Sequence, residues 1–344
     1  ELLMTLLLTD EDKIKIEKIR EENENYISTI NAAVSFISIV TWNGHSISPE
    51  CCYSIGRNML TSDHNKVIVN GNITPDVVIE MDNQTGFIVE IKKSLPNDEK
   101  HWEEIFNQLY KYDDDLIGWW KQEDESVEKI NIVLLIHQSR IVKFIRFLEN
   151  HLVENGYSFS NYFSIVGFNR SEEVKHYYFH QLRYGKTSSE ELTSRLYDGI
   201  EVPIEKVFES FPNLLFFDNE PPAVEYTMGI LWQHLFNSLP RGEYDHHLKG
   251  NPIEINIDDI TLDLQRLFGH KKGDGARNVE FPQKTWIIKA MDCFVLIGLA
   301  KKKDKENYTV IFKQIREELV EYFCKHLSKK NKTDEVIQPS LFPI

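Results

Sequence analysis

The chain has 344 residues, of which 41% are apolar and 12% aromatic, and this composition is typical of a folded protein long enough for two domains. Its formal net charge of -15 argues against a protein that coats nucleic acid over its whole surface, because phosphate binding requires local clusters of lysine and arginine. The four cysteines form no C-x-x-C pair, which argues against an iron–sulphur cluster or a zinc finger, and no signal peptide or long apolar span is visible, so we expect a cytoplasmic protein with no membrane segment.

The first 70 residues are predicted to form two helices and a strand. Apolar residues recur at helical spacing from residue 9 to residue 38. Ser48-Pro49-Glu50 has the composition of a second helix start, and we expect this helix to continue to Leu60. Residues 66–69 predict a strand that turns back onto the next one.

A β-hairpin is predicted within residues 74–93. Two β-branched runs are separated there by the turn residues 83–86. Because side chains alternate between the faces of a strand, Glu90 and Lys92 share one face, and we expect Asp76 beside them. Two adjacent carboxylates repel each other unless a hard cation such as Mg²⁺ lies between them, and a neighbouring lysine can hold or deprotonate a water molecule.

The next predicted helix, over residues 99–116, places Gln108 and Tyr112 on one face, because they are four positions apart. Pro75-Asp76 with Glu90-Ile91-Lys92 resembles the signature of the PD-(D/E)xK nuclease superfamily, and Gln108 with Tyr112 resembles the Q-x-x-x-Y motif of its RecB-like branch. Taken singly, the same residues are explained as a strand-end cap, a solvated salt bridge and a core tyrosine.

The resemblance implies a restriction-endonuclease-like α/β/α fold and a metal site. Asp76, Glu90 and the carbonyl group of Ile91 would bind Mg²⁺ or Mn²⁺. Glu50 resembles the additional acid that many members supply from a preceding helix. A glutamate favoured by the helix dipole in a first turn explains that position equally well.

The resemblance also implies roles for the remaining motif residues. Lys92 would orient the attacking water or take its proton, and Gln108 and Tyr112 would position the phosphate backbone or the lysine. The implied substrate is DNA, hydrolysed to a 5′-phosphate.

The rest of the predicted core follows in chain order. Residues 130–136 are an almost continuous apolar run, which predicts a strand buried on both faces. A helix over 140–155 and strands over 162–167 and 175–181 complete an α/β/α core. We therefore place a nuclease domain at residues 1–185.

Polar residues near 187 indicate the start of a second region. We expect a helical connector over residues 186–240, beginning with a mostly helical stretch from Leu192 to Phe211.

Residues 241–327 are predicted to form a winged-helix-like domain of two helices, 257–268 and 282–299, and a hairpin. The second helix would be the recognition element and the hairpin turn would be the wing. A dimerisation or partner-docking module of the same shape is an equal alternative. The residues predicted to contact nucleic acid are Lys284, Lys289, Lys301, Lys302 and Lys303.

The last segment, 328–344, is predicted to be a mobile tail. Gln338, Leu341 and Phe342 resemble the peptide that binds the bacterial sliding clamp, in which two apolar anchors follow a glutamine. A tail held against its own domain is an equal alternative.

The sequence therefore predicts a Mg²⁺-dependent deoxyribonuclease of bacterial restriction, repair or phage defence. No G-x-x-x-x-G-K-[ST] motif occurs, so any motor would be a partner protein, and a double-strand cut by one site per chain would require a homodimer. Two alternatives remain. Metal dependence would distinguish a non-catalytic DNA-binding or clamp-associated subunit, and recognition of the 2′-hydroxyl of RNA would distinguish an RNA-cleaving defence effector.

Overall fold

In a computed structural model, the chain forms two compact units. The sheet unit comprises residues 28–219 and 268–281, and the helical unit comprises residues 1–27, 220–267 and 282–344. Within these ranges the structure describes residues 10–41, 51–56, 59–61, 72–81, 84–92, 99–113, 116–119, 127–170, 177–204, 216, 222–237, 252–268, 281–311 and 322.

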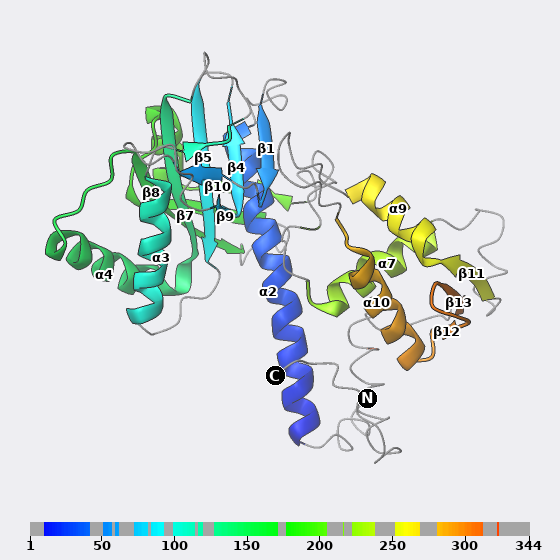
Figure 1. The fold of residues 1–344 in the computed structure, drawn as a ribbon. Helices are drawn as coiled ribbons and strands as arrows, with labels where there is room; N and C mark the ends of the chain where they lie inside the picture. The colour runs from blue at the N-terminus through cyan, green and yellow to red at the C-terminus, as the bar shows by residue number, and fades with distance from the viewer. Residues whose placement is uncertain are drawn as a thin grey trace. The chain divides into compact units, whose positions relative to one another are not determined.

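The sheet unit is built on a seven-stranded mixed sheet (Figure 1). Its strand order is β1-β4-β5-β7-β8-β9-β10, in which β5, β7 and β8 are parallel neighbours and the other neighbouring pairs are antiparallel. The strands are β1 (Cys52–Ile55), β4 (Val77–Glu80), β5 (Thr85–Lys92), β7 (Lys129–His137), β8 (Tyr162–Arg170), β9 (Tyr177–Gly185) and β10 (Ile200–Pro203). A small antiparallel sheet adds β2 (Met59–Thr61), β3 (Asn72–Ile73) and β6 (Leu116–Ile117).

Helices cover both faces of the large sheet. On one face, α3 (Glu99–Tyr112) and α4 (Ile141–Glu154) bury their apolar sides against Ile88, Leu134 and Ile165. On the other face lies the C-terminal half of α2 (Asp10–Thr41), whose Ser35 contacts His180 of β9. The described part of this unit also contains the helical segments η2 (Gln138–Arg140), before α4, and α5 (Glu190–Asp198). The fold class is therefore mixed α/β, as predicted.

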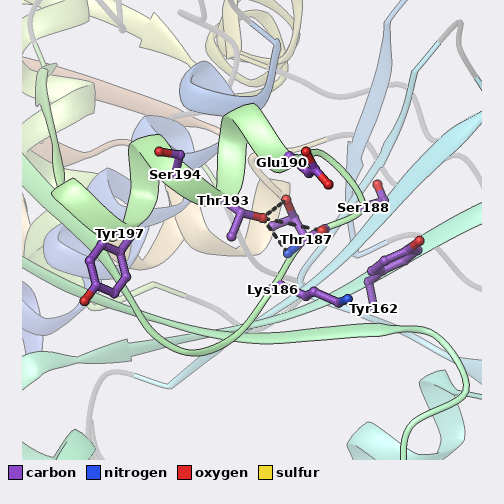
Figure 2. Close-up of a pocket in the computed structure, with 8 residues that line it drawn as sticks. All are labelled: Tyr162, Lys186, Thr187, Ser188, Glu190, Thr193, Ser194 and Tyr197. Atoms are coloured by element: carbon purple, nitrogen blue, oxygen red, sulfur yellow. Dashed lines mark hydrogen bonds between the residues drawn. The ribbon is translucent and has the colours of Figure 1, made fainter.

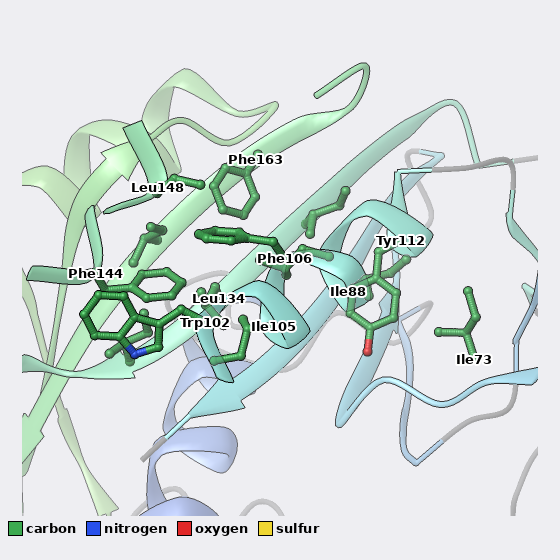
Figure 3. Close-up of a cluster of buried hydrophobic side chains, with 14 of the residues drawn as sticks. Ile73, Ile88, Trp102, Ile105, Phe106, Tyr112, Leu134, Phe144, Leu148 and Phe163 are labelled. Carbon is green, nitrogen blue, oxygen red and sulfur yellow. The ribbon is translucent and has the colours of Figure 1, made fainter. Parts of the chain in front are cut away.

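The cluster beneath α3 and α4 is rich in aromatic rings (Figure 3). Phe106 stacks on Phe144 and Phe147, with ring centroids 5.3 and 5.5 Å apart, and Trp102 meets Phe147 edge-on at 5.1 Å. Offset and edge-to-face pairs of this kind add to the hydrophobic gain of burial. They fix α3 on the sheet, and with it the side chains at its C-terminal end.

Two predictions in this unit are wrong. The helix expected from Ser48 to Leu60 is replaced in its described part by β1 and β2, because pairing of β1 with the buried strand β4 outweighs a local helix-start signal. The sheet also continues past residue 185, since β10 pairs with β9, so the predicted helix over 192–211 ends at Asp198 in its described part. Residues 66–69 lie outside the described part of the chain.

The helical unit contains a second three-stranded sheet. Besides the first part of α2, its described elements in chain order are α7 (Val224–Asn237), β11 (Pro252–Asn256), α9 (Ile257–Phe268), α10 (Lys284–Leu296), β12 (Ala300–Lys302) and β13 (Asn307–Ile311). The sheet is antiparallel with order β11-β13-β12. The two helices and the hairpin lie where the sequence predicted them, and β11 is an addition.

Candidate active site

The hairpin of β4 and β5 brings Asp76 and Glu90 to the same place. Val77 pairs with Val89, so Asp76, one position earlier, comes level with Glu90. The Asp76 carboxylate oxygen Oδ2 accepts a hydrogen bond of 2.7 Å from the backbone N–H of Ile91. This bond fastens the carboxylate of Asp76 to the strand that carries Glu90.

Glu90 is held at both carboxylate oxygens. Lys92 Nζ donates to Glu90 Oε1 at 2.5 Å, and the Tyr112 hydroxyl donates to Oε2 at 2.8 Å. Gln108 Nε2 in turn donates to the Tyr112 hydroxyl at 2.7 Å. Glu90 is only 3% exposed, while the Lys92 side chain is 28% exposed, so the lysine forms the side of this network that solvent reaches.

Tyr112 stays protonated in this arrangement. Its pKa is raised above the usual range mainly by burial, then by the charge of Glu90, the hydrogen bond to Glu90 and the charge of Asp76, while the hydrogen bond from Gln108 acts in the opposite direction. Tyr112 therefore serves as a permanent hydrogen-bond donor.

The structure brings together all five residues predicted to be catalytic, and it changes what two of them contact. Gln108 and Tyr112 were expected to position a phosphate or the lysine. In the structure Gln108 bonds to the Tyr112 hydroxyl and Tyr112 bonds to Glu90, and Tyr112, the last residue of α3, is fully buried (Figure 3). The i, i+4 spacing predicted that the side chains of Gln108 and Tyr112 meet, but it contains no information on their contact with Glu90.

The donor set fits a hard cation. Asp76 and Glu90 supply carboxylate oxygens, each with a second lone pair, and Mg²⁺ is commonly bound by one or two carboxylates completed by water and substrate phosphate. Within the described ranges, no group of three or more His, Cys, Asp or Glu residues could hold a metal ion. Glu50, the predicted third acid, lies outside the described residues.

Three of the five predicted nucleic-acid-binding lysines form ion pairs with neighbouring acids. Lys284 Nζ lies 2.5 Å from an oxygen of Asp258 and 3.1 Å from one of Glu306. Lys302 pairs with Asp292 at 2.8 Å, and Lys303 pairs with Glu254. Lys289 and Lys301 are exposed. The tail residues Gln338, Leu341 and Phe342 lie outside the described part of the chain.

A hollow of about 380 Å³ lies near Tyr162, where β8 begins, at the opposite end of the parallel strands from Lys92 (Figure 2). Thr187 and Thr193 line it and bond to each other, N–H to Oγ1 at 3.0 Å and hydroxyl to hydroxyl at 2.9 Å. Lys186 lies over the ring of Tyr162, 6.0 Å from its centroid. These hydroxyl groups close the turn that leads into α5, so their role is structural.

A second hollow, of about 410 Å³, lies between α4 and β9. Arg146 and Arg183 line it together with Gln138. These residues come from three separate elements and form no motif, so no pattern in the sequence singles them out.

Comparison with known proteins finds no matching family model, no matching curated protein and no matching solved structure. Among the helices that the structure describes, none has the length and apolar character needed to cross a bilayer.

Proposed function

We propose that the protein is a metal-dependent nuclease that hydrolyses phosphodiester bonds of DNA in the cytoplasm of a bacterium, as part of restriction, repair or phage defence. One observation carries this proposal. Glu90 accepts hydrogen bonds from Lys92 and Tyr112, and Asp76 accepts one from the backbone N–H of Ile91. Two carboxylates with an adjacent lysine, at the end of a buried hairpin, are a set of residues that can bind a metal ion and support phosphodiester hydrolysis.

The order of elements supports the same proposal. A mixed sheet with helices on both faces, and a motif hairpin followed directly by α3, is the arrangement expected of a restriction-endonuclease-like core. In the helical unit, a helix, a strand, two helices and a hairpin, with sheet order β11-β13-β12, is the arrangement expected of a winged helix.

Each residue of the site has a distinct task in this reaction. A Mg²⁺ or Mn²⁺ ion bound there would polarise the scissile phosphate and lower the pKa of a water molecule. Asp76, Glu90 and the carbonyl of Ile91 would hold the ion, and Glu50 is the proposed additional ligand. Lys92, which is partly exposed to solvent and next to Glu90, would orient the attacking water and stabilise the negative charge that develops on the phosphate.

Gln108 and Tyr112 act through Glu90. The Tyr112 hydroxyl has one proton, which it donates to Glu90, and one acceptor site filled by Gln108. This arrangement fixes the direction in which the Glu90 carboxylate points. We therefore propose that both are positioning residues rather than contacts to the phosphate backbone.

The ion pairs of the helical unit favour protein docking over DNA reading by its winged-helix-like elements. Lys284, Lys302 and Lys303 already have carboxylate partners, so their contribution to phosphate binding is reduced. A sliding clamp, a defence-system protein or a second copy of the chain are the partners we propose for this unit and the tail.

Cleavage of closed circles tests the proposal. We expect single-stranded or supercoiled DNA circles to be cut with Mg²⁺ or Mn²⁺ and left intact with EDTA. Asp76→Asn, which can keep the bond to Ile91 N–H, and Lys92→Ala should each remove cutting. Lys111→Ala is the matched control, since Lys111 is exposed on α3, and it should cut like the parent protein.

The same assay separates the alternatives. Metal-dependent cutting of RNA alone would replace the deoxyribonuclease by an RNA-cleaving effector. Binding of DNA with no cutting in any metal, or full cutting by Lys92→Ala, would exclude the proposed mechanism. Thermal unfolding of every variant shows that a loss of activity is not a loss of fold.

A further inference from the structure

The groove between α4 and β9 is lined by arginine and glutamine side chains around an apolar strip. About 410 Å³ in volume, it is bordered by Gln138, Arg146 and Arg183 around an apolar strip of Ile141, Val142 and Ile145. Val142 is 63% exposed although it is apolar. We call this feature the Arg146–Arg183 groove.

A β-bulge aims Arg183 into the groove. Ile165 of β8 pairs with Tyr184 and Val166 pairs with Leu182, so Arg183 between them has no cross-strand partner. Bulges of this kind redirect a side chain and are frequent beside functional sites.

Gly167 makes room for the two side chains that meet there. A Cβ atom placed on Gly167 would lie only 3.3 Å from both Arg183 Cγ and Gln138 Cγ. Contacts this short are tighter than most side chains accept, so any larger residue would push the arginine or the glutamine aside. The glycine therefore allows Arg183 and Gln138 to converge on one spot.

The polar groups of the groove include two permanent cations and an unused donor. Among the described residues, Arg146 and Arg183 form no ion pair, and no acidic side chain lines the groove. Gln138 Nε2 is buried and has no hydrogen-bond acceptor within the described structure. Guanidinium groups bind phosphate oxygens in a bidentate manner, and an amide N–H completes such a site. Although the whole chain has a net charge of -15, the groove itself is cationic, so we expect it to bind an anion.

The groove and the candidate active site both lie towards the carboxyl ends of the parallel strands. Lys92 of β5 pairs with Ile136 of β7, and Gln138 follows two residues later, at the carboxyl edge of the same parallel strands. β8 and β9 come next in the sheet, so Arg183 lies three strand spacings from Glu90 and Lys92, roughly 14 Å. A nucleic-acid strand that lies across the active site can reach this groove within a few nucleotides.

We propose that the Arg146–Arg183 groove binds the phosphodiester backbone of the nucleic-acid substrate, a few nucleotides from the bond that is cut. This inference rests on the proposed nuclease function and names a second contact for its substrate. Arg146 and Arg183 bind phosphate oxygens, Gln138 Nε2 donates to the same group, and the Val142–Ile145 strip packs against sugar and base surfaces.

Binding in EDTA tests the groove without cleavage. The probe is a fluorescent single-stranded oligonucleotide, and the readout is anisotropy over a range of salt concentrations. We expect Arg146→Gln and Arg183→Gln each to weaken binding about fivefold to tenfold near 0.1 M salt, and each to reduce the slope of log K against log salt by about 0.7. Arg195→Gln is the control, because Arg195 is exposed on α5, outside the groove, and it should leave both quantities unchanged.

Two outcomes would overturn the inference. The first is an unchanged affinity and salt slope in the double variant. The second is an equal loss of binding to polyglutamate, which would identify the groove as a site for acidic protein. Arg146 lies on the exposed side of α4, so its substitution tests the groove even if replacing the bulge residue Arg183 alters folding.

Failure of this inference is distinguishable from failure of the proposed function. If Lys92→Ala abolishes cutting but the arginine variants bind normally, the groove assignment alone is wrong. If no cutting occurs in any metal but the arginine variants lose affinity and salt slope, the groove remains a nucleic-acid site in a non-catalytic protein.

Discussion

Two tyrosines of α3 carry buried hydroxyl groups with different surroundings. The Tyr112 hydroxyl bonds to Gln108 and Glu90, whereas the Tyr110 hydroxyl, two residues earlier, has no hydrogen-bond partner among the described atoms. A hydroxyl that orients a metal-ligating carboxylate contributes to function, while a buried hydroxyl without a partner only adds desolvation cost. The two residues therefore form a natural pair for comparison.

Tyr112→Phe should keep the fold and lower metal-dependent cleavage about 10-fold to 100-fold, because Glu90 loses the donor that directs one of its oxygens. Tyr110→Phe should leave cleavage unchanged and the protein at least as stable. Cleavage rates at several Mg²⁺ concentrations check this, since a positioning role raises the Mg²⁺ concentration needed for half-maximal rate. Equal rates for the two variants would show that the Tyr112 hydroxyl has only a structural role.

At the scale of elements, α3 is held on the sheet by its aromatic contacts with α4. Phe106 is fully buried and stacks on Phe144, Phe147 and His151, the last with ring centroids 4.9 Å apart. Because Gln108 and Tyr112 lie on the same helix, the packing of Phe106 also determines where the site residues lie.

Phe106→Ala should lower the free energy of unfolding by about 3–5 kcal/mol, because it leaves a cavity among rings that cannot collapse onto it. Urea titration measures this change, with an unchanged m-value expected. Val153→Ala, at an 82% exposed position of α4, should change stability by no more than about 0.5 kcal/mol. A loss below 1 kcal/mol in Phe106→Ala would show that α3 does not depend on this stack.

Elements determined by local sequence were predictable, and those determined by distant partners were not. The hairpin of β4 and β5 follows from alternation and turn residues, and Gln84 does adopt the left-handed backbone conformation of a turn, with φ of 59°. β1 and β10 exist because they pair with β4 and β9, and no local pattern records such a pairing. The ion pairs of the predicted wing and the bulge at Arg183 depend on tertiary structure in the same way.

At the scale of the whole molecule, each of the two units contains a buried titratable group, a base in the sheet unit and an acid in the helical unit. In the sheet unit, burial lowers the pKa of His180 to about 3, and its Nε2 lies 2.6 Å from Ser35 Oγ. In the helical unit, burial and, to a smaller extent, the charge of Glu22 together raise the pKa of Glu225 to about 7, against the lowering effect of a backbone hydrogen bond. Both groups are uncharged in the folded protein under mildly acidic conditions.

These shifts predict opposite responses of the two units to pH. His180 has a folded pKa below its usual value of 6.5, so its contribution to stability is present above 6.5 and is lost as the pH falls towards 3. Glu225 has a folded pKa above its usual value of 4.5, so its contribution is present below 4.5 and is lost as the pH rises through 7. From pH 7 to pH 5 the sheet unit should lose about 2 kcal/mol and the helical unit should gain about 2 kcal/mol.

Amide exchange followed by mass spectrometry, corrected for the intrinsic effect of pH, measures the two units separately. Protection should fall in β7 and rise in β13 on acidification. Glu225→Gln should remove the change in β13 only, and His180→Gln should remove the change in β7 only. A parallel change in both strands would indicate that other groups control the pH dependence.

The two hydrogen bonds that hold the Glu90 carboxylate have a thermodynamic consequence for any ligand that binds to it. A free glutamate side chain loses rotamer freedom equivalent to about 1.5 kcal/mol when it is ordered. Lys92 and Tyr112 have already ordered Glu90 as the chain folded, so this entropy is not lost again when a ligand arrives. In terms of side-chain entropy alone, this prior ordering favours the binding of a ligand at Glu90 by a factor of about ten over a freely rotating carboxylate.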